Sequence, residues 1–300
     1  MRVVRTVAEL RAATKELLAG AAGSAGSSGP TGSAGSIGIV PTMGALHEGH
    51  LSLVRAARAD NAVVVVSIFV NPTQFNEPAD LDAYPRNEER DTRLAADAGA
   101  DIVFAPSAAE MYPEGFATTV SVTGSITETL EGASRGASHF DGVATIVAKL
   151  LLAALADNAY FGAKDAQQVV VVKRMVADLG IPARVVVCPT SRDADGLARS
   201  SRNVRLSAAD RSRALAIPRA LTEVAAAVGA GEFDPQRLRA LATEILAAEQ
   251  IEAEYLAFVD PESLVPVTST HQPTLFALAA RVGEVRLIDN IELRDGAESA

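Results

Sequence analysis

The chain has 300 residues, of which 48% are hydrophobic and only 4% aromatic, so it is long enough to bury a sizeable and mainly aliphatic core. A net charge of -10 argues against a nucleic-acid partner, which usually meets a basic face, and no apolar run approaches the roughly 20 residues of a membrane span. The single cysteine, Cys188, excludes an internal disulfide and ends a valine-rich run, so we expect an inert thiol at a buried strand end. The start of the chain is charged and shows no signal peptide, which predicts a soluble, cytoplasmic protein.

Two different patterns occupy the first 36 residues. Residues 7–18 predict a helix, whereas residues 19–36 are almost wholly Gly, Ala, Ser, Pro and Thr. A segment of that composition cannot bury enough apolar surface to offset its ordering entropy. We therefore expect residues 19–36 to form a flexible insertion with no role in chemistry.

From residue 37 onward, short apolar runs alternate with helical patterns. Continuous valine and isoleucine runs indicate strands that are buried on both faces, as in a parallel sheet. Their alternation with helices predicts an α/β fold, a doubly wound, Rossmann-like parallel-sheet domain over residues 1–189, which would bind ligands beyond the carboxyl ends of its strands. The expected strands are 37–40, 62–70, 101–104, 159–161 and 183–187, and the expected helices are 52–59, 88–98, 142–155 and 166–179.

The pattern changes after about residue 190. Two helices are expected at 207–228 and 234–249, followed by shorter strands at 254–259, 275–282 and 285–288 with a hairpin turn at 282–285. These elements predict a smaller α+β lid domain over residues 190–300. A cleft between two such domains could exclude water from a reactive intermediate.

The most informative segment is PTMGALHEGH, residues 41–50, which joins the first expected core strand to a helix. Gly44 and Gly49 allow the backbone to approach a ligand closely, and a helix start offers unpaired N–H groups to an anion. His47 and His50 then lie where a phosphate would bind. The segment resembles the HIGH motif of adenylate-forming nucleotidyltransferases; the alternative is a plain strand-turn-helix connection with two incidental histidines.

Two further segments carry polar groups suited to a small anionic substrate. After the strongest strand, the turn NPTQF places Asn71 and Gln74 at the presumed cleft, where neutral amides can orient a carboxylate without quenching its nucleophilicity. In the stretch LEGASRGASHFDGV, Arg135 and His139 precede a helix and could face the same substrate. The alternatives are a polar turn and a mobile Gly/Ser loop, respectively.

The segment FGAKDAQQ, residues 161–168, again joins a strand to a helix. Gly162 permits close approach, Lys164 can reach a phosphate, and Asp165 could cap the helix or help to bind a ribose or magnesium. Gln168 lies about one turn into the helix. The alternative is an ordinary capped helix with an exposed lysine.

The fourth segment, SSRN at residues 200–203, lies near the domain junction. The hydroxyls of Ser200 and Ser201 and the guanidinium of Arg202 can hold triphosphate oxygens, and an arginine suits charge that develops on phosphorus. The segment resembles the KMSKS-type loop that accompanies HIGH motifs. Alone it is weak evidence, and its order after the other segments gives it weight.

Together these segments resemble the pantothenate synthetase (pantoate–β-alanine ligase) family, whose pattern runs PTMGxLHxGH, SIFVNPxQF, YPR, LEGxxRPxHF-x-GV, FGxKDxQQ, DGLAxSSRN and RLIDN. The resemblance covers nearly the whole chain except residues 19–36. Three positions depart from the pattern. RPxHF becomes the longer RGASHF without proline, Ala163 stands where glutamate is frequent, and Arg199 stands where Met or Leu is frequent.

The resemblance implies a two-step reaction in which pantoate attacks the α-phosphorus of ATP and β-alanine then attacks the pantoyl adenylate, giving pantothenate, AMP and pyrophosphate. It implies that His50 is the general acid, that His47 and His50 stabilise the pentavalent phosphorus, and that Lys164 and Arg202 complete the catalytic set. It also implies Mg2+ bound through the phosphates of ATP, with its direct protein ligands left open, and a homodimer. The residues implied to contact ATP are Met43, Gly44, His47, His50, Gly162, Ala163, Lys164, Asp165, Ser191 through its backbone, Arg199, Ser200, Ser201 and Arg202, and those implied to contact pantoate or β-alanine are Gln74, Gln168, Asn71, Arg135 and His139.

Other readings remain open at this point. Another HIGH-type nucleotidyltransferase would share the nucleotide motifs but would not need the two glutamines. A class I aminoacyl-tRNA synthetase is disfavoured by the acidic balance and the short chain. A non-catalytic nucleotide-binding regulator could lose His47, His50, Lys164 and Arg202, all of which are intact here.

Overall fold

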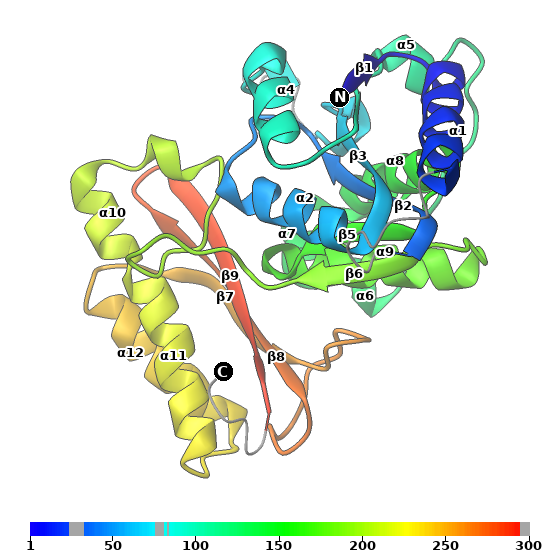
Figure 1. The fold of residues 1–300 in the computed structure, drawn as a ribbon. Coiled ribbons are helices and arrows are strands. Elements are labelled where there is room, and N and C mark those ends of the chain that lie inside the picture. Colours follow the sequence, from blue (N-terminus) through cyan, green and yellow to red (C-terminus); the bar gives the residue numbers. More distant parts are fainter. Residues whose placement is uncertain (24–32, 76–80, 83, 295–300) are drawn as a thin grey trace.

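The computed structural model describes residues 1–23, 33–75, 81–82 and 84–294 and contains two sheets (Figure 1). The larger sheet has six strands in the order β1-β4-β3-β2-β5-β6, and all of its pairings are parallel. The expected doubly wound parallel sheet is therefore confirmed. Its strands are β1 (Arg2–Val4), β2 (Ser33–Thr42), β3 (Asn61–Ile68), β4 (Ile102–Phe104), β5 (Asn158–Gly162) and β6 (Arg184–Cys188).

Helices cover both faces of this sheet, and β3 explains why. Because side chains alternate along a strand, Val63 and Val65 face one layer while Val64 and Val66 face the other, and all four are buried. The first layer contains α1 (Val7–Gly23), α8 (Ala137–Ala154) and α9 (Ala166–Asp178), and the second contains α2 (Glu48–Asp60) and α4 (Glu88–Asp97). None of the helices in the described part of the chain is long and apolar enough to cross a membrane.

Two expectations for this domain are wrong, and one strand was not expected. The expected insertion does not extend over all of residues 19–36, because the helix-favouring alanines at 21 and 22 lie within α1, and β2 already begins at Ser33, which pairs with Asn61. The rest of the insertion, residues 24–32, lies outside the described residues. The short strand β1 was not expected. The strand ending at Cys188 is a partly exposed sheet edge rather than a buried strand, although partial burial raises the pKa of its thiol.

The smaller domain packs two helices against an antiparallel sheet of order β7-β8-β9. The single helix expected at 207–228 is wrong, since it breaks at Leu215; Pro218 has no N–H to donate to residue 214. The hairpin turn at 282–285 is confirmed, with Val282 opposite Val285 and Gly283 at a φ of 57°. The elements are α10 (Ala208–Ala214), α11 (Ala216–Gly229), α12 (Pro235–Ala247), β7 (Ala253–Val259), β8 (Thr274–Val282) and β9 (Val285–Leu293).

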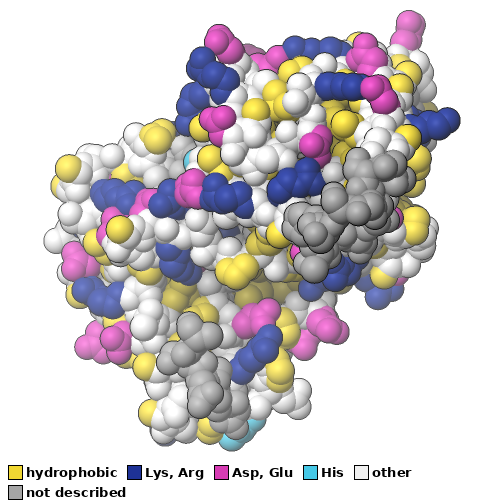
Figure 2. Space-filling model, viewed as in Figure 1, with side chains coloured by type: hydrophobic (Ala, Val, Ile, Leu, Met, Phe, Trp, Pro, Cys, Tyr) yellow, Lys and Arg dark blue, Asp and Glu magenta, His cyan; other side chains and the backbone are white. Residues whose placement is uncertain are grey.

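The two domains share a small apolar contact. Val170 on α9 packs against Val259, Leu275 and neighbouring residues of the small sheet. On the face shown in Figure 2, basic side chains interrupted by acidic ones form a row that crosses from one domain to the other. A domain boundary at residue 190 stays a prediction. Short helices complete the fold: η1 (Pro72–Gln74), α5 (Ala108–Met111), α6 (Ser125–Glu128), α7 (Leu130–Arg135), η2 (Ala163–Asp165) and η3 (Asn203–Arg205).

Candidate active site

The sheet topology brings two of the sequence motifs together. Strand β2 lies between β3 and β5, so the chain leaves the carboxyl ends of β2 and β5 toward opposite halves of the sheet and opens a crevice between them. The HIGH-like segment follows β2, and the turn with Lys164 follows β5. The charges of Lys164 and Asp165 both act on His47, which places the two segments at one site.

The two histidines are fixed by the start of α2. His47 is the N-cap residue, and its Nδ1 accepts a hydrogen bond from the backbone N–H of Gly49 at 3.2 Å. The Nδ1 of His50 accepts from the backbone N–H of His47 at 3.4 Å, and the two ring centroids lie 4.1 Å apart. Since Nδ1 is an acceptor in both rings, each neutral imidazole carries its proton on Nε2, which is the nitrogen free to donate to a ligand.

Both imidazoles are neutral at pH 7 in the free protein. Burial, followed by the charge of His47, lowers the pKa of His50 to about 3. Burial also lowers the pKa of His47, with smaller contributions from Lys164 and Arg199. His50 is therefore a neutral hydrogen-bond donor before ligand binds. It can act as a proton-carrying acid only after an anion raises its pKa.

The loop before the histidines is held by Asp91, which sequence reasoning missed. Its carboxylate, 1% exposed, accepts hydrogen bonds from the backbone N–H groups of Ala45 at 2.7 Å and Leu46 at 2.9 Å. Gly44 and Ala45 both have positive φ, a conformation that needs such support at a non-glycine residue. In the sequence Asp91 is one of several acidic residues on a helix, so nothing marked it.

Asn71 fixes the side chain of Gln74. Its Nδ2 donates to Gln74 Oε1 at 2.9 Å and to the carbonyl of Gly142 at 3.1 Å. Its Oδ1 accepts from Tyr112 at 2.7 Å and Thr73 at 3.0 Å, so all four hydrogen-bonding positions of the buried amide are used within the protein. In the free protein Asn71 therefore positions Gln74, and its expected contact with pantoate or β-alanine stays a prediction.

Arg135 and His139 lie beside this turn. They were expected to precede a helix at 142, but α8 begins at Ala137, so His139 is in its first turn. Gly136, with a φ of 81°, separates α7 from α8 where the family pattern has proline. His139 Nδ1 lies 2.9 Å from the backbone oxygen of Gln74, and burial lowers its pKa. The longer loop thus still brings His139 to Gln74.

The turn after β5 is open at Gly162. A Cβ built there meets nothing within 4 Å among the residues that the structure describes, so these residues leave the space free. Lys164 Nζ lies 3.7 Å from Asp165 Oδ1. Asp165 occupies the N-cap position of α9, as expected, although its side chain accepts no capping hydrogen bond. Gln168 is half-buried on the first turn of α9.

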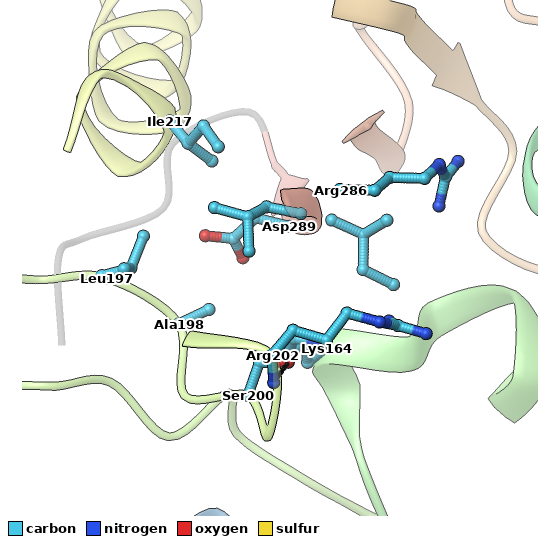
Figure 3. A pocket seen from close by; sticks show the side chains of 10 residues that line it. Lys164, Leu197, Ala198, Ser200, Arg202, Ile217, Arg286 and Asp289 are labelled. Carbon is cyan, nitrogen blue, oxygen red and sulfur yellow. Dashed lines mark hydrogen bonds between the residues drawn. The ribbon is translucent and has the colours of Figure 1, made fainter. Parts of the chain in front are cut away.

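The loop with Arg199 to Arg202 closes the site from the small domain. The Arg199 Cβ lies 3.8 Å from the place that a Gly49 Cβ would take, and the backbone of Arg199 donates to the Ser191 carbonyl at 2.9 Å. Partial shielding from water, followed by the charge of Arg135, lowers the pKa of Arg202. Figure 3 shows a pocket between Lys164, Ser200 and Arg202 on one side and strand β9 on the other.

This arrangement can bind a polyanion and stabilise negative charge on a reacting phosphorus. The cationic groups of Lys164 and Arg199 act on the neutral His47, and Arg202 lines a pocket together with Lys164. Within the described ranges, no group of three His, Cys, Asp or Glu residues could hold a metal ion. Asp165 is a carboxylate beside Lys164, which fits a Mg2+ held mainly by phosphates and water.

Comparisons with known proteins point in one direction. Residues 2–292 match the family model described as pantoate-beta-alanine ligase. The chain is 50% identical over 289 residues to a pantothenate synthetase of Cereibacter sphaeroides, covering 96% of this chain and 98% of that protein. It matches the crystal structure of pantothenate synthetase from Thermus thermophilus with a TM-score of 0.86 at 46% identity, covering 97% of this chain and 99% of that one. The pantoate-beta-alanine ligase of Francisella tularensis, complexed with beta-gamma ATP and beta-alanine, matches with a TM-score of 0.73 at 34% identity, covering 97% of both chains.

Proposed function

The chain belongs to the pantoate-beta-alanine ligase family, and on this premise we propose that it condenses (R)-pantoate with β-alanine to pantothenate, with ATP converted to AMP and pyrophosphate. The observation that carries the proposal is the meeting of the neutral His47 and His50 pair with Lys164 at the switch point of the sheet. ATP and β-alanine are the small molecules named with the Francisella tularensis relative.

In the first step, a carboxylate oxygen of pantoate attacks the α-phosphorus of ATP, and the bond to the pyrophosphate oxygen breaks. Negative charge grows on the phosphoryl oxygens, within reach of donors that are already in place. His47 and His50 would donate from Nε2, while Lys164 and Arg202 would supply positive charge. Mg2+ is expected to bind together with ATP, with at most one protein ligand, Asp165. When bound, it would neutralise charge on the phosphates.

Gln74 and Gln168 would hold pantoate through neutral amides, so that its carboxylate keeps its nucleophilicity. Asn71 sets the Gln74 side chain, and His139 contacts its backbone. In the second step the amine of β-alanine attacks the acyl carbon, loses a proton and displaces AMP. Arg135 lies close enough to act on Arg202 and would face the carboxylate of one of these substrates.

The remaining contacts with ATP are proposed from the positions of the residues in the fold. The backbone around Met43, Gly44, Gly162 and Ala163 lies at the carboxyl ends of β2 and β5 and would line the crevice, and the loop with Ser191, Arg199, Ser200 and Ser201 would cover it. We also propose a homodimer located in the cytoplasm, as the family resemblance implies. Sedimentation velocity of the purified protein tests the first point; a monomer at micromolar concentration would contradict it.

The test of the reaction is exchange of labelled pyrophosphate into ATP with pantoate present and β-alanine absent. We expect exchange that requires pantoate, because only the first step is then possible. Omission of pantoate is the matched control. Tight ATP binding without pantoate-dependent exchange would instead indicate another HIGH-type nucleotidyltransferase or a non-catalytic nucleotide-binding regulator.

A further inference from the structure

The segment Arg286-Leu287-Ile288-Asp289-Asn290 of β9 belongs to the small domain, yet its polar side chains reach the site. Asn290 provides the most direct contact. Its Nδ2 donates to the backbone oxygens of Ala163 at 3.0 Å and Lys164 at 2.8 Å. The short turn that carries Lys164 is therefore held from the other domain, at the start of a helix that has no side-chain cap of its own.

Arg286 holds a second part of the site. Its guanidinium donates two hydrogen bonds of 2.7 Å to the carboxylate of Glu131 on α7. Burial alone would raise the pKa of Glu131, but the hydrogen bonds from Arg286 lower it to about 2, so the pair is fully charged. Glu131 also accepts from Arg135 at 3.1 Å and from Tyr255 at 3.0 Å. Arg135 and Arg286 are thus linked through one carboxylate.

Asp289 holds the third part. It points to the opposite face of β9 from Arg286 and Asn290, since side chains alternate along a strand. Its buried carboxylate accepts from both Nη atoms of Arg192, at 2.7 and 3.0 Å. Arg192 in turn accepts from Arg199 Nε through its backbone oxygen at 3.1 Å. The chain leading to Ser200 and Arg202 is anchored in this way.

We propose that β9 acts as a clamp, in which Arg286, Asp289 and Asn290 are positioning residues that set the spacing between Lys164, the loop to Arg202, and Arg135. Figure 3 shows Arg286 and Asp289 across the pocket from Lys164, Ser200 and Arg202. One rigid strand fixes three segments that are far apart in sequence. The proposal rests on the proposed function, since it concerns the donors of the first step.

A double-mutant cycle in the pyrophosphate-exchange assay tests the clamp. Asn290→Ala removes the two hydrogen bonds that Asn290 donates to the turn with Lys164. We expect the exchange rate at saturating ATP and pantoate to fall about 10-fold or more, because misplacement of a reacting group by about 1 Å can lower a rate by up to 100-fold. In a Lys164→Ala background the same change should cost less than about twofold, since Asn290 acts through Lys164. Glu292→Gln, an exposed position on the same strand that bonds Arg294, is the control and should exchange at the wild-type rate.

Equal losses in both backgrounds, or wild-type exchange by Asn290→Ala, would overturn the clamp. If the wild type shows no pantoate-dependent exchange, the proposed reaction is refuted instead. The clamp is then tested by calorimetry, by comparing the affinity for a non-hydrolysable ATP analogue among the wild type, the two single variants and the double variant. If Asn290→Ala does not fold, Arg286→Lys decides: it keeps the charge but loses the two-pronged contact, so exchange should fall severalfold, whereas Arg281→Lys at an exposed position should have no effect. Equal rates for these two variants would reject the proposal.

Discussion

Substitution of Gly142 by alanine should impair the use of pantoate while leaving the protein folded. Gly142 lies where α8 crosses the turn that carries Gln74. A Cβ at this position would lie 2.5 Å from the oxygen and 2.7 Å from the carbonyl carbon of Thr73, and 3.0 Å from the backbone nitrogen of Gln74. These are backbone atoms, so they cannot rotate away. Reaching an ordinary contact of 3.4 Å requires the helix or the turn to move by about 0.9 Å, the difference between 3.4 and 2.5 Å.

Such a shift affects stability modestly and chemistry strongly. Overpacking costs about 1–3 kcal/mol, partly offset by about 1 kcal/mol of helix propensity gained on replacing glycine. A displacement near 1 Å can lower a rate by up to 100-fold, so we expect kcat/KM for pantoate in the exchange assay to fall by about 10- to 100-fold. Gly229→Ala, at the end of α11 where a Cβ meets nothing within 4 Å, is the control. A wild-type kcat/KM for pantoate in Gly142→Ala would refute the placement of pantoate at Gln74.

Four further changes follow from the same geometry. His50→Ala should lower turnover by about 100-fold or more, and near-normal activity would remove His50 from the mechanism. His50 takes up a proton near pH 6.5 in the unfolded chain but only near pH 3 in the folded chain, so the free energy of unfolding should decrease as the pH falls through this window. Denaturant titrations at several pH values should show a shallower decrease for His50→Gln. An equal dependence on pH in the two proteins would contradict the lowered pKa of His50. Asp91→Ala leaves two loop N–H groups unpaired and should raise the KM for ATP and destabilise the protein by about 1–3 kcal/mol, whereas an unchanged KM would separate the loop from nucleotide binding. Gly162→Ala should keep or raise the melting temperature, since its φ of −81° suits alanine, yet raise the KM for ATP; an unchanged KM would mean that the open space is not the nucleotide's.

The parallel sheet could be predicted because its signal is local. The run at Val63 to Val66 leaves no polar face, so the strand must be buried on both sides, and the chemistry-bearing segments follow strand ends directly. The place of these segments at the edge of the sheet then follows from the order of the strands rather than from any one side chain. The same local reasoning failed at residues 19–36, where alanines extend α1 and backbone pairing with β3 overrides composition at Ser33.

The supporting residues could not be predicted, because their meaning lies in contacts with distant segments. Asp91 reads as a surface acid until the loop at Ala45 folds onto it, 46 residues away in the chain. Gly142 reads as an ordinary helix glycine until the Gln74 turn lies against it. Asn290 bonds a carbonyl 126 residues away, and no spacing within β9 indicates that partner.

The neutral state of the two histidines changes how the site works. Charged imidazoles beside Lys164 and Arg199 would repel these groups and would already bind the ground-state phosphates tightly. Neutral imidazoles, each with Nδ1 bonded to the backbone and Nε2–H left to donate, can crowd together with the cations at little electrostatic cost. We propose that their hydrogen bonds would strengthen as negative charge develops on the phosphoryl oxygens, which would lower the barrier rather than the energy of the bound substrate. We propose that burial, together with the backbone contacts at the start of α2, contributes to catalysis by keeping His47 and His50 uncharged.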